Sequence, residues 1–271
     1  MIAVAPNNGT DIKTRLEVLT EEVSASRLKR WSTCRLQFFF HYVAQIRKPV
    51  TAALVVGKVV HSVLQEWNRA RWKGDFTFRD RLPEVFDAEW QAEQVEQEID
   101  WGGDQEKQKG AALGLLELYL DQTPIKPEEK PMGVEVMLEA ADLGKHGLPK
   151  LIGVIDLVRP GGVIVDYKTS AQTPNPENIA HLNEIQLTCY GILFRDATNQ
   201  IESGIELHHL VKTKTPKLIV TQLPPITDHQ QTRLFKQIES YVEGVQREDF
   251  IPSPGMACLS CQFIGECKKW S

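Results

Sequence analysis

The sequence has no long apolar segment and no strong excess of one charge. No apolar run approaches the roughly 20 residues that a membrane-spanning helix needs. The first residues, MIAVAPNNGTDIKTRLEVL, lack the basic region, apolar core and cleavage site of a signal peptide. We therefore expect a cytoplasmic protein without membrane contact. The net charge of −5 gives no general attraction to phosphate, but binding a nucleic acid requires only a local basic face.

Cysteine is scarce, and the five cysteines are unevenly placed at Cys34, Cys189, Cys258, Cys261 and Cys267. An odd number does not suit a closed set of disulfides, and clustered cysteines in a reducing compartment more often bind metal. The last three have the spacing C-x-x-C-x5-C, one thiolate short of a four-cysteine site, so Cys34 and Cys189 are the candidates for the fourth. Cys189 lies within a predicted helix and is expected to pack in the core. An iron–sulfur cluster, a structural Zn²⁺ site and unrelated thiols all remain open.

Several signatures of nucleotide-driven and sequence-specific DNA proteins are missing. The chain has no G-x-x-x-x-G-K-[ST] phosphate loop, so any ATP-driven unwinding must come from a partner. It also has no zinc-finger or helix-turn-helix signature, so sequence-specific recognition is not indicated. Basic residues gather in 27–35 and 212–217, where they face either phosphates or solvent.

The hydrophobic pattern predicts an α/β protein with a central mixed sheet flanked by helices. With 271 residues, the chain is long enough for one large core. We expect a flexible leader over 1–22 and one domain over 23–271. That domain has a helical part at about 23–121, a sheet core at about 132–250 and a cysteine cluster at 251–271. The sequence predicts strands at 133–140, 150–158, 162–167, 205–211 and 217–223, and helices at about 24–34, 35–43, 54–72, 82–120 with a break at Gly102-Gly103, 177–195 and 228–247.

Two acidic residues and a lysine lie at the ends of two predicted neighbouring strands. Asp156 is near the end of one strand, and Asp166 and Lys168 end the next, after a hairpin turn at 159–162. Alternate residues of a strand share a face, so Asp166 and Lys168 project to the same side, close to Asp156. Two buried carboxylates repel each other unless a cation neutralises them, and oxygen ligands suit Mg²⁺ or Mn²⁺. A surface salt pair is the simpler alternative.

This arrangement suits phosphodiester hydrolysis. The reaction needs a nucleophilic water, neutralisation of the charge that develops on the phosphate, and help for the leaving oxygen. Metal ions on aspartates supply the first and last of these. A neighbouring lysine can orient the water and offset the negative charge.

The segments GVIDLV and VIVDYKT resemble the PD-(D/E)XK nuclease superfamily, and in particular its RecB-like branch. Two further motifs are similar to that branch: G-x-x-x-H at Gly57 to His61, and Q-x-x-x-Y at Gln186 to Tyr190. The resemblance implies a restriction-endonuclease-like core. It implies the metal ligands His61, Asp156, Asp166 and Tyr167 (through its carbonyl), and the catalytic residues Asp156, Asp166, Lys168, Gln186 and Tyr190. A core histidine and an ordinary amphipathic pair are the alternatives for His61 and for Gln186 with Tyr190.

The resemblance also implies a function and a second cofactor. It implies a Mg²⁺- or Mn²⁺-dependent deoxyribonuclease, an exonuclease on single-stranded DNA or DNA ends, in DNA repair, recombination or CRISPR adaptation. The alternatives are a structure-specific endonuclease, or a non-catalytic DNA-end-binding or assembly partner of a helicase or integrase. Members with a [4Fe–4S] cluster join one early cysteine to a C-terminal group. By that resemblance Cys34, Cys258, Cys261 and Cys267 would ligate such a cluster and tether the chain ends, with Zn²⁺ as the alternative.

Overall fold

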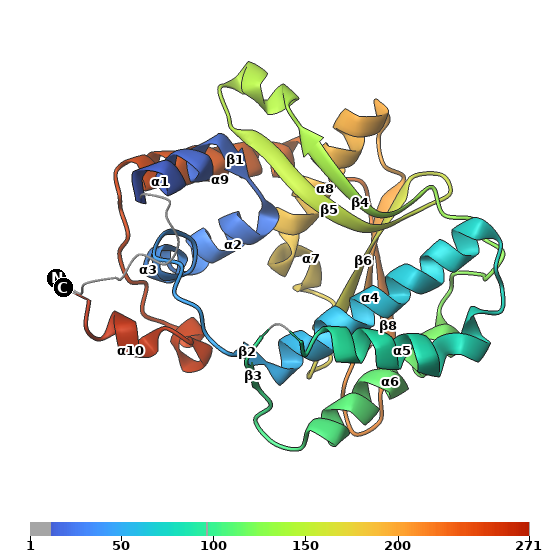
Figure 1. Ribbon diagram of the computed structural model, residues 1–271. Coiled ribbons are helices and arrows are strands. Elements are labelled where there is room, and N and C mark those ends of the chain that lie inside the picture. The colour runs from blue at the N-terminus through green and yellow to red at the C-terminus, as the bar shows by residue number, and fades with distance from the viewer. Residues whose placement is uncertain (1–11, 96, 271) are drawn as a thin grey trace.

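The computed structural model describes residues 12–95 and 97–270, and it has a mixed sheet with helices on both faces (Figure 1). The helices are α1 (Ile12–Glu21), α2 (Ala25–Thr33), α3 (Arg35–Phe38), α4 (Ala52–Lys73), α5 (Leu82–Ala92), α6 (Gln105–Gln122), α7 (Ile179–Leu182), α8 (Glu184–Thr198), α9 (Asp228–Gln246) and α10 (Ile264–Cys267). The strands are β1 (Glu22–Val23), β2 (Val50–Thr51), β3 (Ile99–Asp100), β4 (Gly133–Ala140), β5 (Lys150–Arg159), β6 (Val163–Ser170), β7 (Gly204–Val211) and β8 (Lys217–Leu223). A π-helix, η1 (Phe39–Val43), continues α3, and the 3-10 helices are η2 (Phe78–Arg81), η3 (Asp142–His146) and η4 (Met256–Ser260).

The main sheet contains all the long strands that the sequence predicts, in the order β1-β5-β6-β7-β8, with β4 also paired to β5. The pairs β4–β5, β5–β6 and β7–β8 are antiparallel, whereas β6 and β7 are parallel and are connected through α8. The predicted hairpin turn between β5 and β6 is confirmed. Its Gly161 and Gly162 have φ angles of 81° and 80°, a left-handed conformation that glycine adopts without strain. The predicted α/β class with a mixed sheet is therefore confirmed.

Each face of the sheet carries its own hydrophobic core. Helices α4, α5 and α6 cover one face, where Leu157, Val165 and Tyr167 pack beneath them. Helices α1, α2, α8 and α9 cover the other face and pack on residues such as Ile164 and Leu207. Because side chains alternate along β6, its even-numbered residues point toward α8 and its odd-numbered residues toward α4. No helix of the described residues is long and apolar enough to cross a membrane.

The predicted flexible leader over 1–22 is wrong for the residues that the structure describes. Residues 12–21 form α1, and Val23 of β1 pairs with β5. Leu19 is buried, and its carbonyl accepts a hydrogen bond from the Tyr241 hydroxyl on α9 at 2.7 Å. Local patterns did not predict this packing, because α1 is stabilised by a helix more than 200 positions away. Residues 1–11 lie outside the described residues.

Local signals predicted most helix boundaries correctly. Gly74 ends α4 in a left-handed conformation, and Thr227 starts α9 with a capping box. The helix expected at 35–43 instead divides into α3 and the π-helix η1, where Phe38 and Phe40 are buried. These aromatic side chains belong to the core and do not offer rings for base stacking.

Candidate active site

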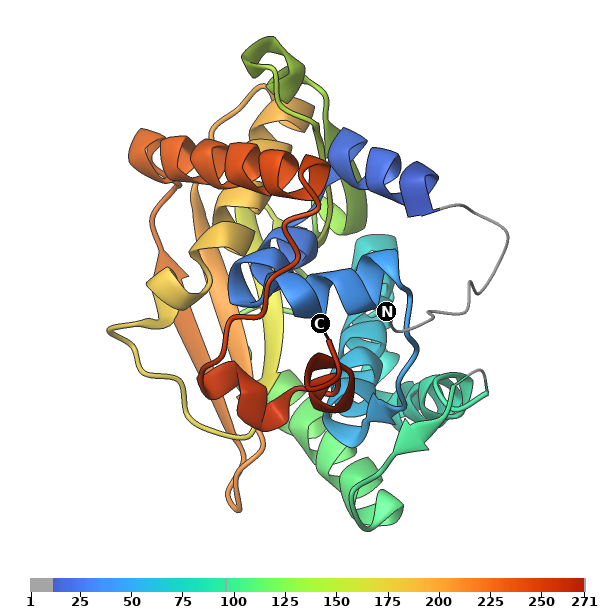
Figure 2. The same ribbon diagram turned by 90° about the vertical axis from the view of Figure 1, so that its left-hand side faces the viewer.

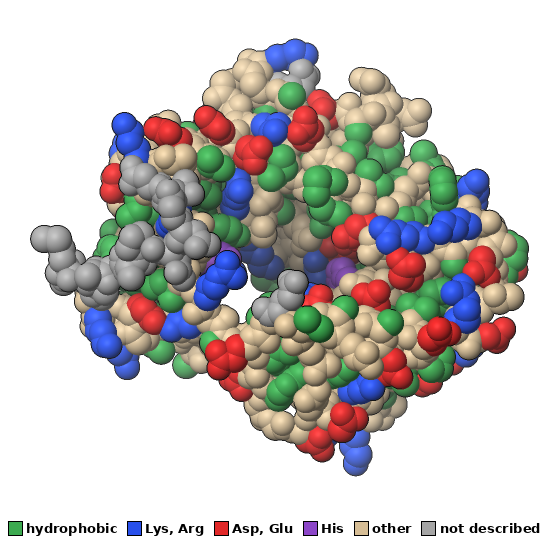
Figure 3. Space-filling model, in the orientation of Figure 1, with side chains coloured by type: hydrophobic (Ala, Val, Ile, Leu, Met, Phe, Trp, Pro, Cys, Tyr) green, Lys and Arg blue, Asp and Glu red, His purple; other side chains and the backbone are tan. Residues whose placement is uncertain are grey.

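The candidate active site lies where β5 and β6 separate. Their ladder has three pairs, from Arg159 opposite Val163 to Leu157 opposite Val165, and then ends. Beyond it the Asp156 side chain replaces the missing ladder bond, because its Oδ2 accepts a hydrogen bond from the Tyr167 backbone N–H at 2.9 Å. The opening lets side chains from both helical layers reach the same place. Figure 3 shows a hollow near the centre of this face, with basic and histidine side chains in it.

Lys168 is at the centre of the site. Its Nζ donates to Asp166 Oδ1 at 2.9 Å and to Gln186 Oε1 at 2.8 Å. Gln186 Nε2 in turn donates to Asp166 Oδ1 at 3.0 Å and to the Tyr190 hydroxyl at 2.7 Å. The four predicted residues therefore form one hydrogen-bonded group from β6 and α8. The i,i+4 spacing of Gln186 and Tyr190 places both on the helix face toward β6.

His61 approaches the same group from the opposite layer. Its Nδ1 lies 3.5 Å from Asp156 Oδ2, and its side chain is 35% exposed. Burial alone lowers the pKa of His61, but the hydrogen bond and charge of Asp156, with the charge of Asp166, outweigh it and raise that pKa. Gly57 sits where α4 comes close to β6, since a Cβ there would lie 3.2 Å from Thr169 Oγ1. The glycine of G-x-x-x-H thus permits the approach that brings His61 to the carboxylates.

Asp166 is an almost fully buried carboxylate whose charge is only partly compensated. Burial and the nearby Asp156 raise its pKa from 3.8 to about 6, against the opposing effects of Lys168 and His61. Asp166 Oδ2 lies 2.7 Å from Lys168 Nζ but has no hydrogen-bond partner among the described residues. An incompletely satisfied buried carboxylate beside a second one is where a cation stabilises a protein most.

The donor set fits a divalent cation, although the side chains do not form a closed shell around one. Among residues 12–95 and 97–270, no group of three or more His, Cys, Asp or Glu side chains is arranged to hold a metal ion. Lys168 Nζ provides the one positive charge within 3 Å of the Asp166 carboxylate among the contacts of the described residues. The chemistry of one imidazole and two carboxylates, together with the unsatisfied Asp166 Oδ2, nevertheless suits Mg²⁺ or Mn²⁺.

The Tyr167 side chain points to the opposite face of the sheet, where it connects β6 to α4. Its hydroxyl accepts a hydrogen bond from the buried Asn68 at 2.9 Å. Asn68 lies two turns beyond His61 on α4, so this bond fixes the helix relative to β6. From there a buried polar chain continues away from the site through Arg71, Glu129, Arg159, Glu206, His208 and Tyr119.

Two residues near the site were not predicted from the sequence. The β4–β5 register pairs Val134 with Leu157 and Val136 with Ile155, which places Glu135 opposite Asp156. Loss of hydration and the charge of Asp156 raise the pKa of the exposed Glu135, whereas His61 and Arg69 lower it. Its backbone φ of 49° is a conformation that residues other than glycine rarely adopt. Backbone strain of this kind is found most often at functional sites.

The second is His209, which is paired in register with Lys168 across β6–β7. It is 6% exposed, and its Nδ1 has no hydrogen-bond partner among the described residues. Burial and Lys168 both lower its pKa. Neither Glu135 nor His209 belongs to a recognisable motif, so only the strand register reveals them.

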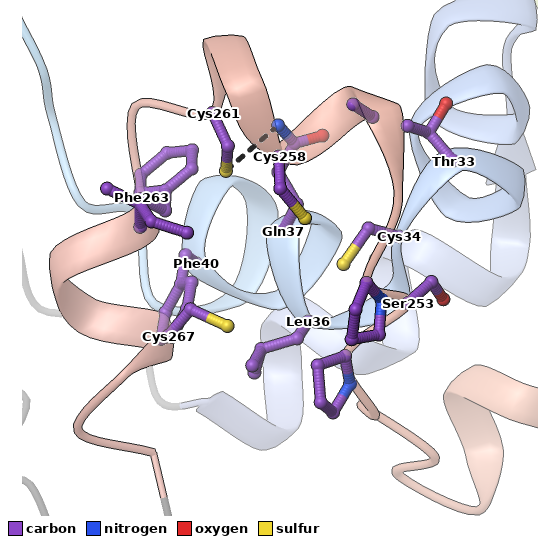
Figure 4. Close-up of a pocket in the computed structure, with 14 residues that line it drawn as sticks. Thr33, Cys34, Leu36, Gln37, Phe40, Ser253, Cys258, Cys261, Phe263 and Cys267 are labelled. Atoms are coloured by element: carbon purple, nitrogen blue, oxygen red, sulfur yellow. Dashed lines mark hydrogen bonds between the residues drawn. The ribbon is translucent and has the colours of Figure 1, made fainter.

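The four predicted cluster cysteines converge on one small pocket between the chain ends. Cys34, Cys258, Cys261 and Cys267 line a cavity of about 40 Å³ together with apolar side chains of α3 and the C-terminal segment (Figure 4). Figure 2 shows the red C-terminal segment beside the blue helices of the N-terminal part. Gln37 Nε2 donates to Cys261 Sγ at 3.6 Å. Burial and the three other thiols raise the pKa of Cys267. The four thiols are therefore close enough to influence one another.

Further contacts hold the two ends of the chain together. The Leu36 N–H donates to the Ile251 carbonyl at 3.0 Å, and Lys48 pairs with Glu266 at 2.5 Å. Cys189 lies elsewhere and is 1% exposed, which confirms its predicted core role.

Residues 27–35 and 212–217 are not open basic patches throughout. Arg35 pairs with Asp249, and Lys212 donates to Gln108 at 2.7 Å. Trp31 is buried among Phe38, Tyr241 and Phe250. Part of the basic character expected to face phosphates is thus used within the fold.

A family comparison identifies the class of protein that carries this fold and this carboxylate–lysine group. The profile of the PD-(D/E)XK nuclease superfamily matches residues 22–268, and the chain belongs to this superfamily. Among curated proteins, no sequence matches the chain.

Two solved structures are similar over nearly the whole chain. A crystal structure of a candidate exonuclease from Eubacterium rectale has 15% identity and a TM-score of 0.56, covering 98% of this chain and 94% of its own. The structure of SSO0001 has 15% identity and a TM-score of 0.45, covering 96% and 95%. At this identity the first likeness concerns the fold alone.

Proposed function

We propose that this protein is a Mg²⁺- or Mn²⁺-dependent deoxyribonuclease of the RecB-like branch, acting as an exonuclease on single-stranded DNA or DNA ends. The observation that carries the proposal is the group around Lys168, in which Asp166, Gln186 and Tyr190 form a continuous hydrogen-bonded chain. A lysine held by Asp166 and Gln186, the second of which is held in turn by Tyr190, is poised to act on a ligand beside it. A solvated surface lysine is not restrained in this way.

The side chains have distinct proposed roles. The Lys168 ammonium orients the attacking water and offsets negative charge on the phosphate. Gln186 and Tyr190 keep that ammonium in place, and the Tyr167 N–H keeps Asp156 turned toward His61. In the metal-free protein burial raises the pKa of Asp166 to about 6, so its carboxylate is mostly ionised and available as a ligand near neutral pH.

His61, Asp156, Asp166 and the Tyr167 carbonyl would hold the metal. When bound, the ion activates water and stabilises the leaving oxygen. Its charge would also relieve the repulsion between the two aspartates, which the protein alone offsets only in part.

The four pocket cysteines are proposed to ligate a [4Fe–4S] cluster. Their support is the convergence of Cys34 with Cys258, Cys261 and Cys267 from opposite ends of the chain. A single Zn²⁺ at about 2.3 Å from each sulfur would draw the thiols within roughly 4 Å of one another. Among the described residues the thiols are not arranged around a single ion, and Zn²⁺ is the alternative to the cluster. A helicase or integrase partner would supply DNA ends, in repair, recombination or CRISPR adaptation.

The experiment is a cleavage assay with end-labelled single- and double-stranded DNA, titrated with Mn²⁺ and Mg²⁺. Lys168→Ala and Asp166→Ala should each lower cleavage by at least about a thousandfold while leaving the melting temperature within a few degrees. Lys109→Ala is the matched control, because Lys109 also pairs with an aspartate, Asp87, at 2.7 Å. It should keep full activity.

Two results would contradict the proposal. Cleavage that survives in both site variants would remove the assigned residues from the reaction. DNA binding by the wild type without cleavage at any metal concentration would favour the non-catalytic end-binding factor.

A further inference from the structure

A second groove lies beside the candidate active site, on the exposed side of α4. It has a volume of about 520 Å³ and is lined by Glu66, Arg69, Trp72 and Lys73 of α4 and by 132–134 at the start of β4. It is separate from the cysteine pocket and takes no part in the site described above. Its lining combines an aromatic ring with basic side chains.

Residues of α4 and β4 that line the groove are neighbours in sequence of residues at the candidate active site. Glu135 directly follows the β4 residues of the lining, and it is opposite Asp156 in the strand register. The charges of His61 and Arg69 both act on Glu135, so this residue lies between the site and the groove. A DNA strand that leaves the site along α4 and β4 would therefore meet the groove next.

Helix geometry sets the direction and length of this path. Trp72 follows His61 by three turns on nearly the same helix face, about 16 Å further along α4 at about 1.5 Å per residue. That distance corresponds to about five stacked nucleotides at roughly 3.4 Å each, and to fewer in an extended strand. The groove thus lies within reach of the nucleotides next to the scissile phosphate.

The chemistry of the groove suits a single strand. Trp72 is 51% exposed, although most tryptophans of the described residues are buried or partly buried. Lys130 Nζ lies 5.3 Å from the centre of its ring. Arg69 is balanced by Glu66 at 2.7 Å, which leaves Lys73 and Lys130 as the positive charges beside the ring. Aromatic rings stack on unpaired bases and lysines attract the phosphates between them.

We propose that the α4–β4 groove holds the single-stranded DNA that flanks the cleaved bond, with Trp72 stacked on a base. This inference rests on the proposed nuclease function and adds a binding track to it. In a duplex the bases are already stacked on each other, so the track favours single strands.

The test measures binding and cleavage of fluorescent oligothymidylates of two lengths, about 4 and about 12 nucleotides, the range of single-strand sites. Trp72→Ala should weaken binding of the longer oligonucleotide by about tenfold, the loss expected for one stacked base. It should weaken binding of the shorter one less, because about four stacked nucleotides do not span the distance of about 16 Å from His61 to Trp72. Trp72→Phe should recover most of the affinity. Phe76→Ala is the matched control, because Phe76 is 56% exposed but does not line the groove.

A second variant tests the charge. Lys73→Glu should reduce the slope of log affinity against log salt concentration by about 1, the change expected when one phosphate contact is lost. Lys236→Glu should not, because Lys236 lines a different groove at α9.

The outcomes separate the two proposals. If Trp72→Ala binds the longer oligonucleotide like the wild type, or weakens duplex and single strand equally, the track is refuted while the nuclease proposal stands. If the wild type cleaves neither length, the nuclease function fails, and a tenfold loss of affinity in Trp72→Ala would still support the track.

Discussion

The carboxylate–lysine site and the cysteine pocket are constructed in opposite ways. In the former, hydrogen bonds among the protein's own side chains hold Lys168 and Gln186 in one geometry. In the latter, the four thiols line a common space, and Gln37 is their one side-chain hydrogen-bond donor among the described residues. The first site comes from neighbouring strands and a helix, whereas the second joins segments more than 200 residues apart. Under the proposals above, the first site would need its metal for chemistry, whereas the second would need its bound group for structure.

Removing the cysteine-bound group should have the largest effect on stability. Cys258→Ala should lose the visible iron–thiolate absorption and the bound iron, about four atoms per chain. It should lower the free energy of unfolding by about 3–5 kcal/mol, because the ligated group closes a loop of more than 200 residues. Metal analysis and thermal unfolding measure both. Cys189→Ala, outside the pocket, should keep its iron, and a colourless wild type rich in zinc would replace the cluster with Zn²⁺.

The second largest effect should be a pH dependence of metal binding at the carboxylate–lysine site, which the cysteine pocket should not share. Protons compete with the metal for His61, whose pKa is raised, and for Asp166, whose pKa is about 6. Mn²⁺ affinity should therefore fall by about tenfold per pH unit for each competing proton as pH drops below about 6. Calorimetric titration of Mn²⁺ checks this. An affinity that stays constant between pH 5 and pH 7 (roughly the range that straddles this pKa) would exclude these ligands.

Asp166→Asn should stabilise the metal-free protein while it abolishes cleavage. Folding raises the pKa of Asp166 from 3.8 to about 6, so its favourable contribution is complete below 3.8 and is lost as pH rises through about 6. At pH near 8 the neutral amide should add about 1–3 kcal/mol of stability, reduced by the lost pairing with Lys168. Urea unfolding at low and high pH measures the difference. Equal stability of variant and wild type at high pH would contradict the raised pKa.

Tyr190→Phe should give the smallest effect. It removes the hydroxyl that accepts from Gln186 at 2.7 Å, a contact worth about 1 kcal/mol, or about fivefold in rate. The melting temperature should hardly change. Tyr241→Phe is the comparison, because its hydroxyl bonds Leu19 far from the site, and it should lower stability while leaving the rate unchanged. Identical rates for Tyr190→Phe and wild type would remove Tyr190 from the positioning of Lys168.

Local patterns were sufficient where neighbouring residues decide the structure. Alternation predicted β4 at its observed bounds, and the glycine pair predicted the β5–β6 turn. The spacing of Asp166 and Lys168 predicted their common face, which their 2.9 Å contact confirms. These features depend on residues close in sequence, and so a single chain reveals them.

Features that depend on distant segments could not be predicted. Helix α1 is held by α9, and Glu135 is brought opposite Asp156 by a register that no motif encodes. The role of Gly153 likewise depends on a segment distant in sequence. A Cβ there would lie 2.7 Å from Leu193 Cδ1, so the glycine of G-x-x-D permits α8 to cross β5 closely. The sequence motif identifies the glycine, but its role becomes clear only from the packing of α8 on β5.

The position between Asp166 and Lys168 has a consequence for mutational tolerance. Tyr167 is 2% exposed, and its hydroxyl joins β6 to Asn68 on the helix that carries His61. The middle residue of D-x-K is therefore not a spacer in this protein. If all amino acids were tried at 167, those without a ring-borne hydrogen-bonding group should lower DNA cleavage, although the side chain at this position points away from Lys168 to the other face of the sheet.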